Sequence, residues 1–240
     1  MNSKNICLWS SPRNISTALM YSFAQRPDTL VIDEPLYAHY LVESGADHPG
    51  KDEIINSMES CGENVVNHII LKDYEKDVVF MKQMTHHLIN IDEQFLEKVV
   101  NVFLIRDPRQ LIASLSLVIN NITMRDTGIQ KQYELYERLN SGNIDSIVID
   151  SGVILRNPEI ALTKLCNNLH IPFYKEMLKW KAGGIKEDGV WAKYWYENVH
   201  NSTGFEKQQT SSRELPPGLN DLYEECLPFY EKMFKHSIKV

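Results

Sequence analysis

Several features that define common protein classes are missing from this chain of 240 residues. No apolar run approaches the roughly 18 residues of a membrane-spanning helix, and no signal-peptide pattern precedes the first apolar run. The four cysteines lack the spacing of a metal site, so we interpret them as reduced side chains of a mainly structural kind. We therefore expect a cytoplasmic protein that needs neither a membrane nor a metal ion.

An excess of positive charge is also missing. The net charge is −7 and the isoelectric point is about 5.6, which argues against a general nucleic-acid-binding protein. A local basic pocket for an anionic cofactor remains compatible with this negative net charge. The length and the 43% apolar content suit one domain, which we expect to span residues 1–240.

Short apolar runs alternate with segments of helical periodicity along most of the chain. This alternation predicts an α/β fold of three layers, α/β/α, around a central, mostly parallel sheet of four to five strands. The runs that we interpret as strands are residues 6–9, 29–33, 78–82, 99–105 and 144–149.

The turn after the first predicted strand, residues 10–17, is the first candidate site. The hydrophobic period changes there from strand to helix, so backbone N–H groups at the helix start point outward and favour an anion, to which Arg13 can add a fork of donors. Ser16 and Thr17 can cap the helix or bind that anion. An ordinary turn with a serine N-cap is the alternative. No glycine lies between Ile6 and Ala24, which excludes the nucleotide-triphosphate signature G-x-x-x-x-G-K-[ST].

Further candidates follow the other predicted strands. Glu34 follows the second, where ligands of open α/β sheets gather, although a helix-capping acid is the alternative. His86 and His87 follow the third, and either one can act as a general base at neutral pH; their spacing does not suit a metal. Arg106 ends the fourth strand and Ser114 lies two helical turns later, so the two can share one anion. The alternative is an Arg106–Asp107 ion pair beside a surface serine.

Residues 182–196 combine three glycines, two lysines and four aromatic side chains without a clean period. We interpret this stretch as an irregular loop that contributes to a binding site, because aromatic surface of this extent is rarely left in water. An aromatic cluster that covers the core is the competing interpretation.

Taken together, these motifs resemble the sulfotransferase superfamily, whose members use 3′-phosphoadenosine-5′-phosphosulfate (PAPS). The resemblance covers roughly residues 5–175 and implies a P-loop nucleotide-binding-like fold. By this resemblance, Arg106 and Ser114 bind the 3′-phosphate of the cofactor, and Lys186 adds a weaker match near a glycine. The loop that would bind the 5′-phosphosulfate consists of Ser11, Pro12, Arg13, Asn14, Ile15, Ser16 and Thr17.

The same resemblance suggests the catalytic groups. Arg13 and Glu34 match the arginine and the catalytic glutamate of the protein-tyrosine branch, whereas His86 loosely echoes the histidine base of the small-molecule branch; Glu34 is our first choice. Ile15 occupies the place of the usual loop glycine. A β-branched residue resists positive φ, so the loop backbone is expected to take another route around the phosphate.

We therefore predict an enzyme that transfers a sulfuryl group from PAPS to a hydroxyl or amine of a small-molecule acceptor. Aromatic side chains near Tyr37 and Trp195 suggest an apolar or aromatic-lined acceptor pocket, and packing in the core is the equal alternative. Two alternatives remain: a kinase or nucleotide hydrolase on the same fold, and a non-catalytic binding protein that retained the fold.

Overall fold

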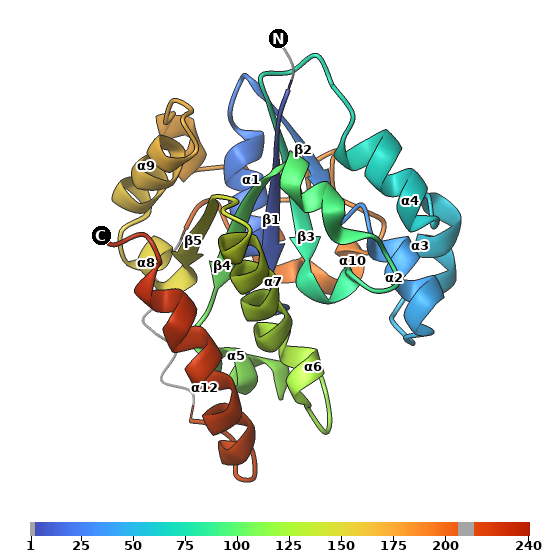
Figure 1. The fold of residues 1–240 in the computed structure, drawn as a ribbon, viewed down its shortest axis with the longest axis vertical. Coiled ribbons are helices and arrows are strands. Elements are labelled where there is room, and N and C mark those ends of the chain that lie inside the picture. Colours follow the sequence, from blue (N-terminus) through green and yellow to red (C-terminus); the bar gives the residue numbers. More distant parts are fainter. Residues whose placement is uncertain (1–2, 206–213) are drawn as a thin grey trace.

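The computed structural model describes residues 3–205 and 214–240. In this part of the chain a five-stranded parallel sheet has the order β2-β3-β1-β4-β5 (Figure 1). The strands are β1 (Lys4–Ser10), β2 (Thr29–Asp33), β3 (Val78–Met84), β4 (Val100–Ile105) and β5 (Ser146–Asp150). The predicted α/β fold with a central parallel sheet is thereby confirmed. The fifth strand begins two residues later than predicted.

Both faces of the sheet are covered, which explains why its strands are apolar at nearly every position. Ile6 and Leu8 of β1 enter one hydrophobic cluster, and Cys7 and Trp9 enter another on the opposite face. This separation follows from the two-residue period of a strand. The sequence pattern of β1 is therefore that of a central strand in a three-layer protein.

Helices from distant parts of the chain form the two outer layers. On the face of Ile6, the core includes side chains of α1 (Ser16–Ala24), α2 (Tyr37–Ser44), α3 (Lys51–Ser57), α8 (Ser151–Arg156) and α9 (Pro158–Asn168). On the face of Trp9, it includes side chains of α4 (Gly62–Val65), a π-helical turn (Val66–Ile70), a 3₁₀ segment (Glu93–Lys98), α7 (Ile129–Ser141) and α12 (Asn220–Lys235). Figure 1 shows α7 lying over the sheet with α12 beside it.

The remaining short helices lie in the connections. They are 3₁₀ turns at Thr85–His87 and Lys175–Leu178, and the helices α5 (Pro108–Leu115), α6 (Met124–Thr127), α10 (Ala192–Trp195) and α11 (Glu197–His200). The stretch predicted as an irregular loop, residues 182–196, thus contains the one-turn helix α10.

The strand order places a switch point beside β1. The chain builds β2 and β3 on one side of β1 and then crosses to build β4 and β5 on the other. Open α/β sheets bind their ligands beyond the carboxyl ends of the strands at such a point. The topology therefore puts the β1–α1 loop, the end of β2 and the end of β4 around one crevice.

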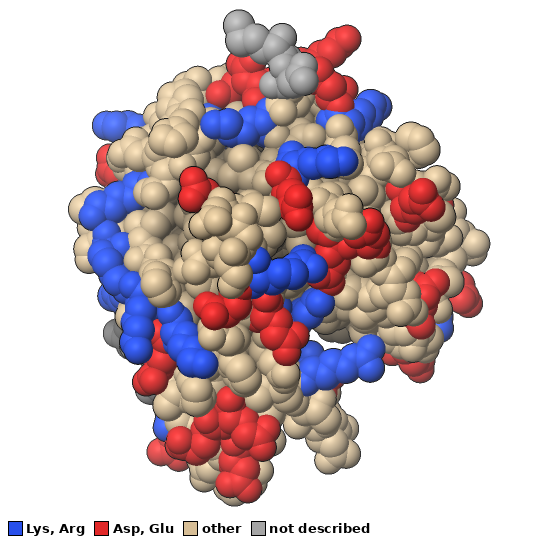
Figure 2. Space-filling view, viewed as in Figure 1, with Lys and Arg blue, Asp and Glu red and all other residues tan. Residues whose placement is uncertain are grey.

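Two general surface features follow from the described residues. None of their helices is long and apolar enough to cross a membrane. Figure 2 shows lysine and arginine side chains interspersed with acidic ones, and an acidic group at the lower end of α12, where Asp221, Glu224 and Glu225 lie.

A buried amide joins the two central strands. The indole Nε1 of Trp9 donates to Asn101 Oδ1 at 2.9 Å, and Asn101 Nδ2 donates to the carbonyl oxygens of Leu96 at 2.8 Å and Val99 at 3.3 Å. Trp9 and Asn101 are both fully buried. One asparagine of β4 thus satisfies polar groups of β1 and of the segment that precedes β4.

Replacing Asn101 by Ala should lower the free energy of unfolding by about 2–4 kcal/mol, since it leaves buried polar groups unpaired and opens a small cavity. Urea denaturation measures this loss. Trp9→Phe should cost less in the Asn101→Ala background than in the wild type, because its N–H partner is already gone. Strictly additive effects of the two substitutions would contradict the described role of this amide.

Candidate functional site

The β1–α1 loop is held in a strained conformation by an arginine from β4's end. Arg13 has a φ of +54°, which a non-glycine residue adopts at a cost of roughly 1–3 kcal/mol. Arg106 donates from Nη1 to the carbonyl oxygen of Arg13, and Arg13 Nε donates to Ser114 Oγ of α5 at 3.1 Å. The three predicted residues therefore meet, but Ser114 pairs with Arg13, whereas Arg106 anchors the loop backbone.

The loop accommodates Ile15 because its positive φ falls on a different residue, Arg13. Ile15 has a φ of −89°, so the β-branched side chain carries no positive φ. Asn14 completes the turn, because its Oδ1 accepts from the Ile15 N–H at 2.9 Å and its Nδ2 donates to the Leu104 carbonyl at 3.0 Å. The positive φ falls on Arg13, two residues earlier.

A cavity of about 640 Å³ opens at the start of α1. The first N–H groups of a helix have no acceptor within the helix, and among the described residues no side chain caps α1. The helix dipole favours an anion at the same place. The polar side chains that line this larger cavity are Arg13, Asn14, Thr17, Arg106, Ser114, Asn198, Asn201 and Ser202. Such a wall suits a phosphorylated ligand of nucleotide size.

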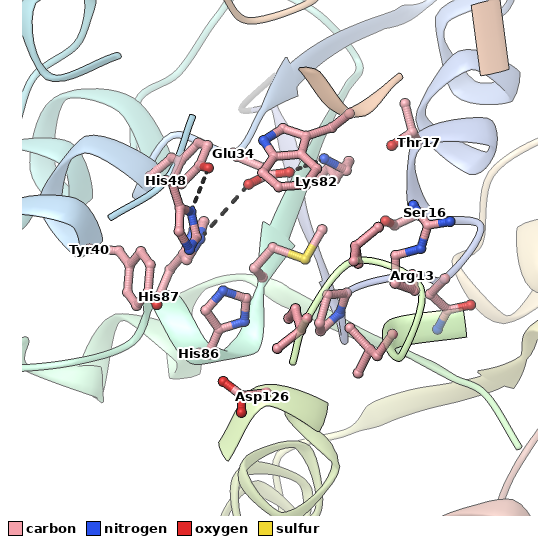
Figure 3. Close-up of a pocket in the computed structure, with 18 of the residues that line it drawn as sticks. Arg13, Ser16, Thr17, Glu34, Tyr40, His48, Lys82, His86, His87 and Asp126 are labelled. Atoms are coloured by element: carbon pink, nitrogen blue, oxygen red, sulfur yellow. Dashed lines mark hydrogen bonds and ion pairs between the residues drawn. The ribbon is translucent and has the colours of Figure 1, made fainter. Parts of the chain in front are cut away.

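A second cavity, of about 230 Å³, adjoins the first one. Its walls share Arg13, Asn14, Thr17, Trp195 and Tyr196 with the larger cavity. The remainder of the smaller cavity is mainly aromatic, imidazole and aliphatic, with the Glu34 carboxylate among these groups. Figure 3 shows the loop side chains Arg13, Ser16 and Thr17 on one side and Tyr40, His86 and His87 on the other.

A buried ammonium group ties together the ends of β2 and β3. Lys82, which is fully buried, donates to Asp33 Oδ1 at 3.0 Å, to the Tyr196 hydroxyl at 2.7 Å and to Glu34. The Tyr196 hydroxyl donates to the Asp33 carboxylate, and Gly189 N donates to Asp33 Oδ2 at 3.3 Å. Residues 189–196 are thereby fixed to the strand ends.

The charges of this network shift the pKa values of its members. Burial raises the pKa of Glu34; Lys82 opposes that shift, and the charge of Asp33 adds to it. Burial by itself lowers the pKa of Lys82, but attraction to Asp33 and Glu34 outweighs it, so the pKa is raised and the ammonium stays charged. Because one ammonium serves two carboxylates, it does not offset the burial of Glu34 completely, and the pKa of Glu34 stays raised.

Glu34 itself has an unusual backbone and a specific neighbour. Its φ is +39°, and its N–H donates to the Lys82 carbonyl at 2.8 Å. Glu34 Oε2 lies 3.9 Å from Nε2 of His87 (Figure 3). The His87 ring stacks on the rings of both Tyr37 and Tyr40. Burial lowers the pKa of His87 well below its ordinary value, so this imidazole is neutral.

The structure places the other predicted residues as follows. Pro12 and Ser16 line the smaller cavity, together with His86, and Ile15 lines the larger one. Ser11 is buried and lines neither cavity. Lys186 also lines neither: its side chain is 88% exposed, and its ammonium lies 3.5 Å from Glu187. The structure thus does not bring Lys186 to the arginines.

Sequence reasoning missed the Asp33–Lys82–Tyr196 connection. A lysine inside an otherwise apolar strand is a detectable signal, because lysine is rarely buried without a carboxylate partner. Tyr196 carries no such signal, since it lies 114 residues after Lys82. Among the described residues, no group of three or more His, Cys, Asp or Glu side chains is arranged to hold a metal ion.

The fold and the site define an open α/β protein whose two adjoining cavities lie at the switch point of its sheet. The family profile described as "Sulfotransferase domain" matches residues 4–237. The chain therefore belongs to the sulfotransferase domain family.

Solved structures and curated proteins extend this comparison. The sulfotransferase domain from the Synechococcus PCC 7002 olefin synthase has a TM-score of 0.67 at 16% identity and covers 100% of this chain and 98% of its own. A sulfotransferase from Alicyclobacillus acidocaldarius has a TM-score of 0.59 at 12% identity and covers 99% and 98%. At these identities the likeness shows the fold.

Two Arabidopsis thaliana proteins are more similar in sequence. They are named branched-chain-amino-acid aminotransferase-like proteins 2 and 1, and each is 40% identical over 229 residues. The matched region is 95% of this chain but 41% of each relative, so the chain spans less than half the length of these proteins.

Replacing Lys82 by Met should lower the free energy of unfolding by about 3–5 kcal/mol at pH 7, since it leaves two buried carboxylates without their counter-charge. The loss relative to the wild type should shrink as the pH falls. In the variant the folded carboxyl groups have raised pKa values and bind protons before those of the unfolded chain do, which favours the folded state at low pH.

Urea denaturation at pH 7 and pH 5 tests this. Lys193→Met, which breaks the exposed Lys193–Glu53 pair, is the matched control and should leave stability nearly unchanged. Equal effects of the two substitutions would show that the buried network is not what holds the strand ends.

Proposed function

We propose that this chain is a PAPS-dependent sulfotransferase that acts on a hydroxyl or amine of a small acceptor. The observation that carries the proposal is the junction of the two cavities. A polar cavity at a helix N-terminus adjoins a smaller cavity that holds a buried carboxylate, and Arg13 and Thr17 belong to both walls. A donor and an acceptor can thus occupy neighbouring sites.

The residues of the larger cavity fit the donor. Uncapped N–H groups of α1 and the guanidinium of Arg13 suit the 5′-phosphosulfate, and Arg106 and Ser114 suit a further phosphate. When bound, PAPS would supply the sulfuryl group. Donors fixed in advance by the β1–α1 loop favour charge that develops during transfer, and they need no rearrangement at that moment.

The smaller cavity fits an acceptor whose reacting hydroxyl or amine lies against Glu34. A base acts best when its pKa approaches the working pH, and burial moves the pKa of Glu34 in that direction. Lys82, which also donates to Asp33, holds the Glu34 carboxylate in place. His86 and His87 are neutral and lie in the same cavity, and the other carboxylate of its wall, Asp126, accepts hydrogen bonds from Thr123, which favours Glu34 as the base.

The names of the Arabidopsis relatives point to another chemistry, transamination. Those names describe proteins of which the matched region is 41%, whereas the sulfotransferase profile matches residues 4–237 of this chain. Phosphoryl transfer from ATP on the same fold is a second alternative, and the loop lacks the Gly-Lys-[ST] signature that it requires.

Glu34→Gln should abolish formation of sulfated acceptor from PAPS while binding of adenosine 3′,5′-bisphosphate stays within about twofold, because the substitution removes the base and not the donor site. Mass spectrometry of a phenol and amine panel measures turnover, and calorimetry measures binding. The exposed Glu137→Gln is the matched control. Normal turnover by Glu34→Gln would eliminate Glu34 as the base.

Arg106→Gln should weaken binding of adenosine 3′,5′-bisphosphate roughly 10- to 100-fold, since it removes both a cationic donor and the anchor of Arg13. Arg109→Gln, three residues further along and outside both cavities, serves as the control and should bind normally. If ATP with magnesium bound more tightly than the bisphosphate to the wild-type protein, the proposed donor would be wrong.

A further inference from the structure

The smaller cavity holds a cation that the proposed chemistry does not use. Its charged residues are Arg13, Glu34, Lys82, Arg125 and Asp126. Arg13 belongs to the wall shared with the larger cavity, and Lys82 is buried between carboxylates. Arg125 comes from α6, which contributes neither to the shared wall nor to the buried network around Lys82.

The guanidinium of Arg125 is not engaged elsewhere. Throughout residues 3–205 and 214–240, no ion pair, side-chain hydrogen bond or ring contact involves it, and the residue is exposed while it lines the smaller cavity. The neighbouring Asp126 is engaged instead: its Oδ2 accepts from the N–H and the hydroxyl of Thr123, at 2.8 and 2.7 Å, as a helix cap.

A neutral imidazole shares the cavity with this arginine. His86 and Arg125 line the same smaller cavity, and the pKa of His86 is lowered to about 4, mainly by burial, with smaller contributions from the charges of His48 and Arg125. Figure 3 shows His86 projecting into the cavity above Asp126, on the side away from Arg13. Its ring packs edge-on against Tyr40 and His87. A neutral imidazole has one N–H to donate.

Part of the wall of the smaller cavity is apolar. Met84 ends β3, and Leu115, Val118 and Ile119 come from the end of α5 and the segment after it. The volume of about 230 Å³ is below the usual 300 Å³ or more of drug-sized sites, so the occupant is small. His87 stacks on both Tyr37 and Tyr40, so one face of each of these rings is covered and does not offer a cation–π site for an ammonium group.

We infer that Arg125, with His86 beside it, forms a subsite for a carboxylate, so that the acceptor is a small hydroxy- or amino-carboxylate with an apolar or aromatic body. Its reacting hydroxyl or amine lies against Glu34, its body against Met84 and Leu115, and its carboxylate at Arg125. This inference rests on the proposed function for the role of Glu34, whereas the anion subsite stands on the cavity alone.

Three probes that share one phenol test the subsite in the wild-type chain. They are 3-(4-hydroxyphenyl)propionate, its neutral methyl ester, and the cation tyramine. Calorimetry without PAPS should show the carboxylate binding at least about tenfold more tightly than either other probe, as a charge-assisted pair predicts. Arg125→Gln should remove this preference and leave binding of the ester unchanged. Arg125→Lys should retain part of it.

Arg138→Gln, on the exposed face of α7, is the matched control and should keep the full preference. Melting temperatures of the variants within a few degrees of the wild type establish that each is folded. Tighter binding of tyramine or the ester, no binding of the carboxylate at millimolar concentration, or an unchanged preference in Arg125→Gln would each overturn the inference.

Turnover assays distinguish a failure of the carboxylate subsite from a failure of the proposed sulfuryl transfer. If the carboxylate binds through Arg125 but PAPS yields no sulfated product with any hydroxy- or amino-carboxylate, the subsite stands and the proposed reaction fails. If sulfated product forms equally well from the ester and the carboxylate, the reaction stands and the subsite fails.

Discussion

A buried ammonium group between two carboxylates is the constraint on which the site depends. Lys82 projects from the central region of the sheet, where an unpaired charge would be very costly, so Asp33 and Glu34 must lie at the end of the neighbouring strand β2. Asp33 in turn accepts from Tyr196 and Gly189. One requirement for charge compensation thus fixes the position of Glu34 and closes the aromatic segment over the cavities.

A second fixed element faces this network across the crevice. Arg106 anchors the strained residue Arg13, which in turn donates to Ser114. Positive φ values at both Arg13 and Glu34 place backbone strain on the two sides of the junction between the cavities. Strain of this kind persists where the surrounding contacts over-determine the conformation, and it is characteristic of functional sites.

Much of the fold was predictable because its signals are local. Apolar runs fix the strands of a covered parallel sheet, and the rule that ligands gather beyond carboxyl strand ends selects Arg13, Glu34 and Arg106. Side-chain pairing was not predictable. The sequence spacing suggested that Arg106 and Ser114 bind one anion together. In the structure Ser114 instead accepts a hydrogen bond from Arg13, and Arg106 donates to the Arg13 carbonyl. Tyr196 joins the network through a contact between distant segments. Lys186 is exposed and lines neither cavity, and its segment has no regular period from which the direction of the side chain could be predicted.

The most direct test of the two-cavity account is a crystal structure with adenosine 3′,5′-bisphosphate and 3-(4-hydroxyphenyl)propionate. The account predicts the 5′-phosphate at the N-terminus of α1 beside Arg13, the second phosphate near Arg106, and the phenol hydroxyl facing Glu34 in the smaller cavity. A bisphosphate bound in the smaller cavity, or away from the β1–α1 loop, would contradict it.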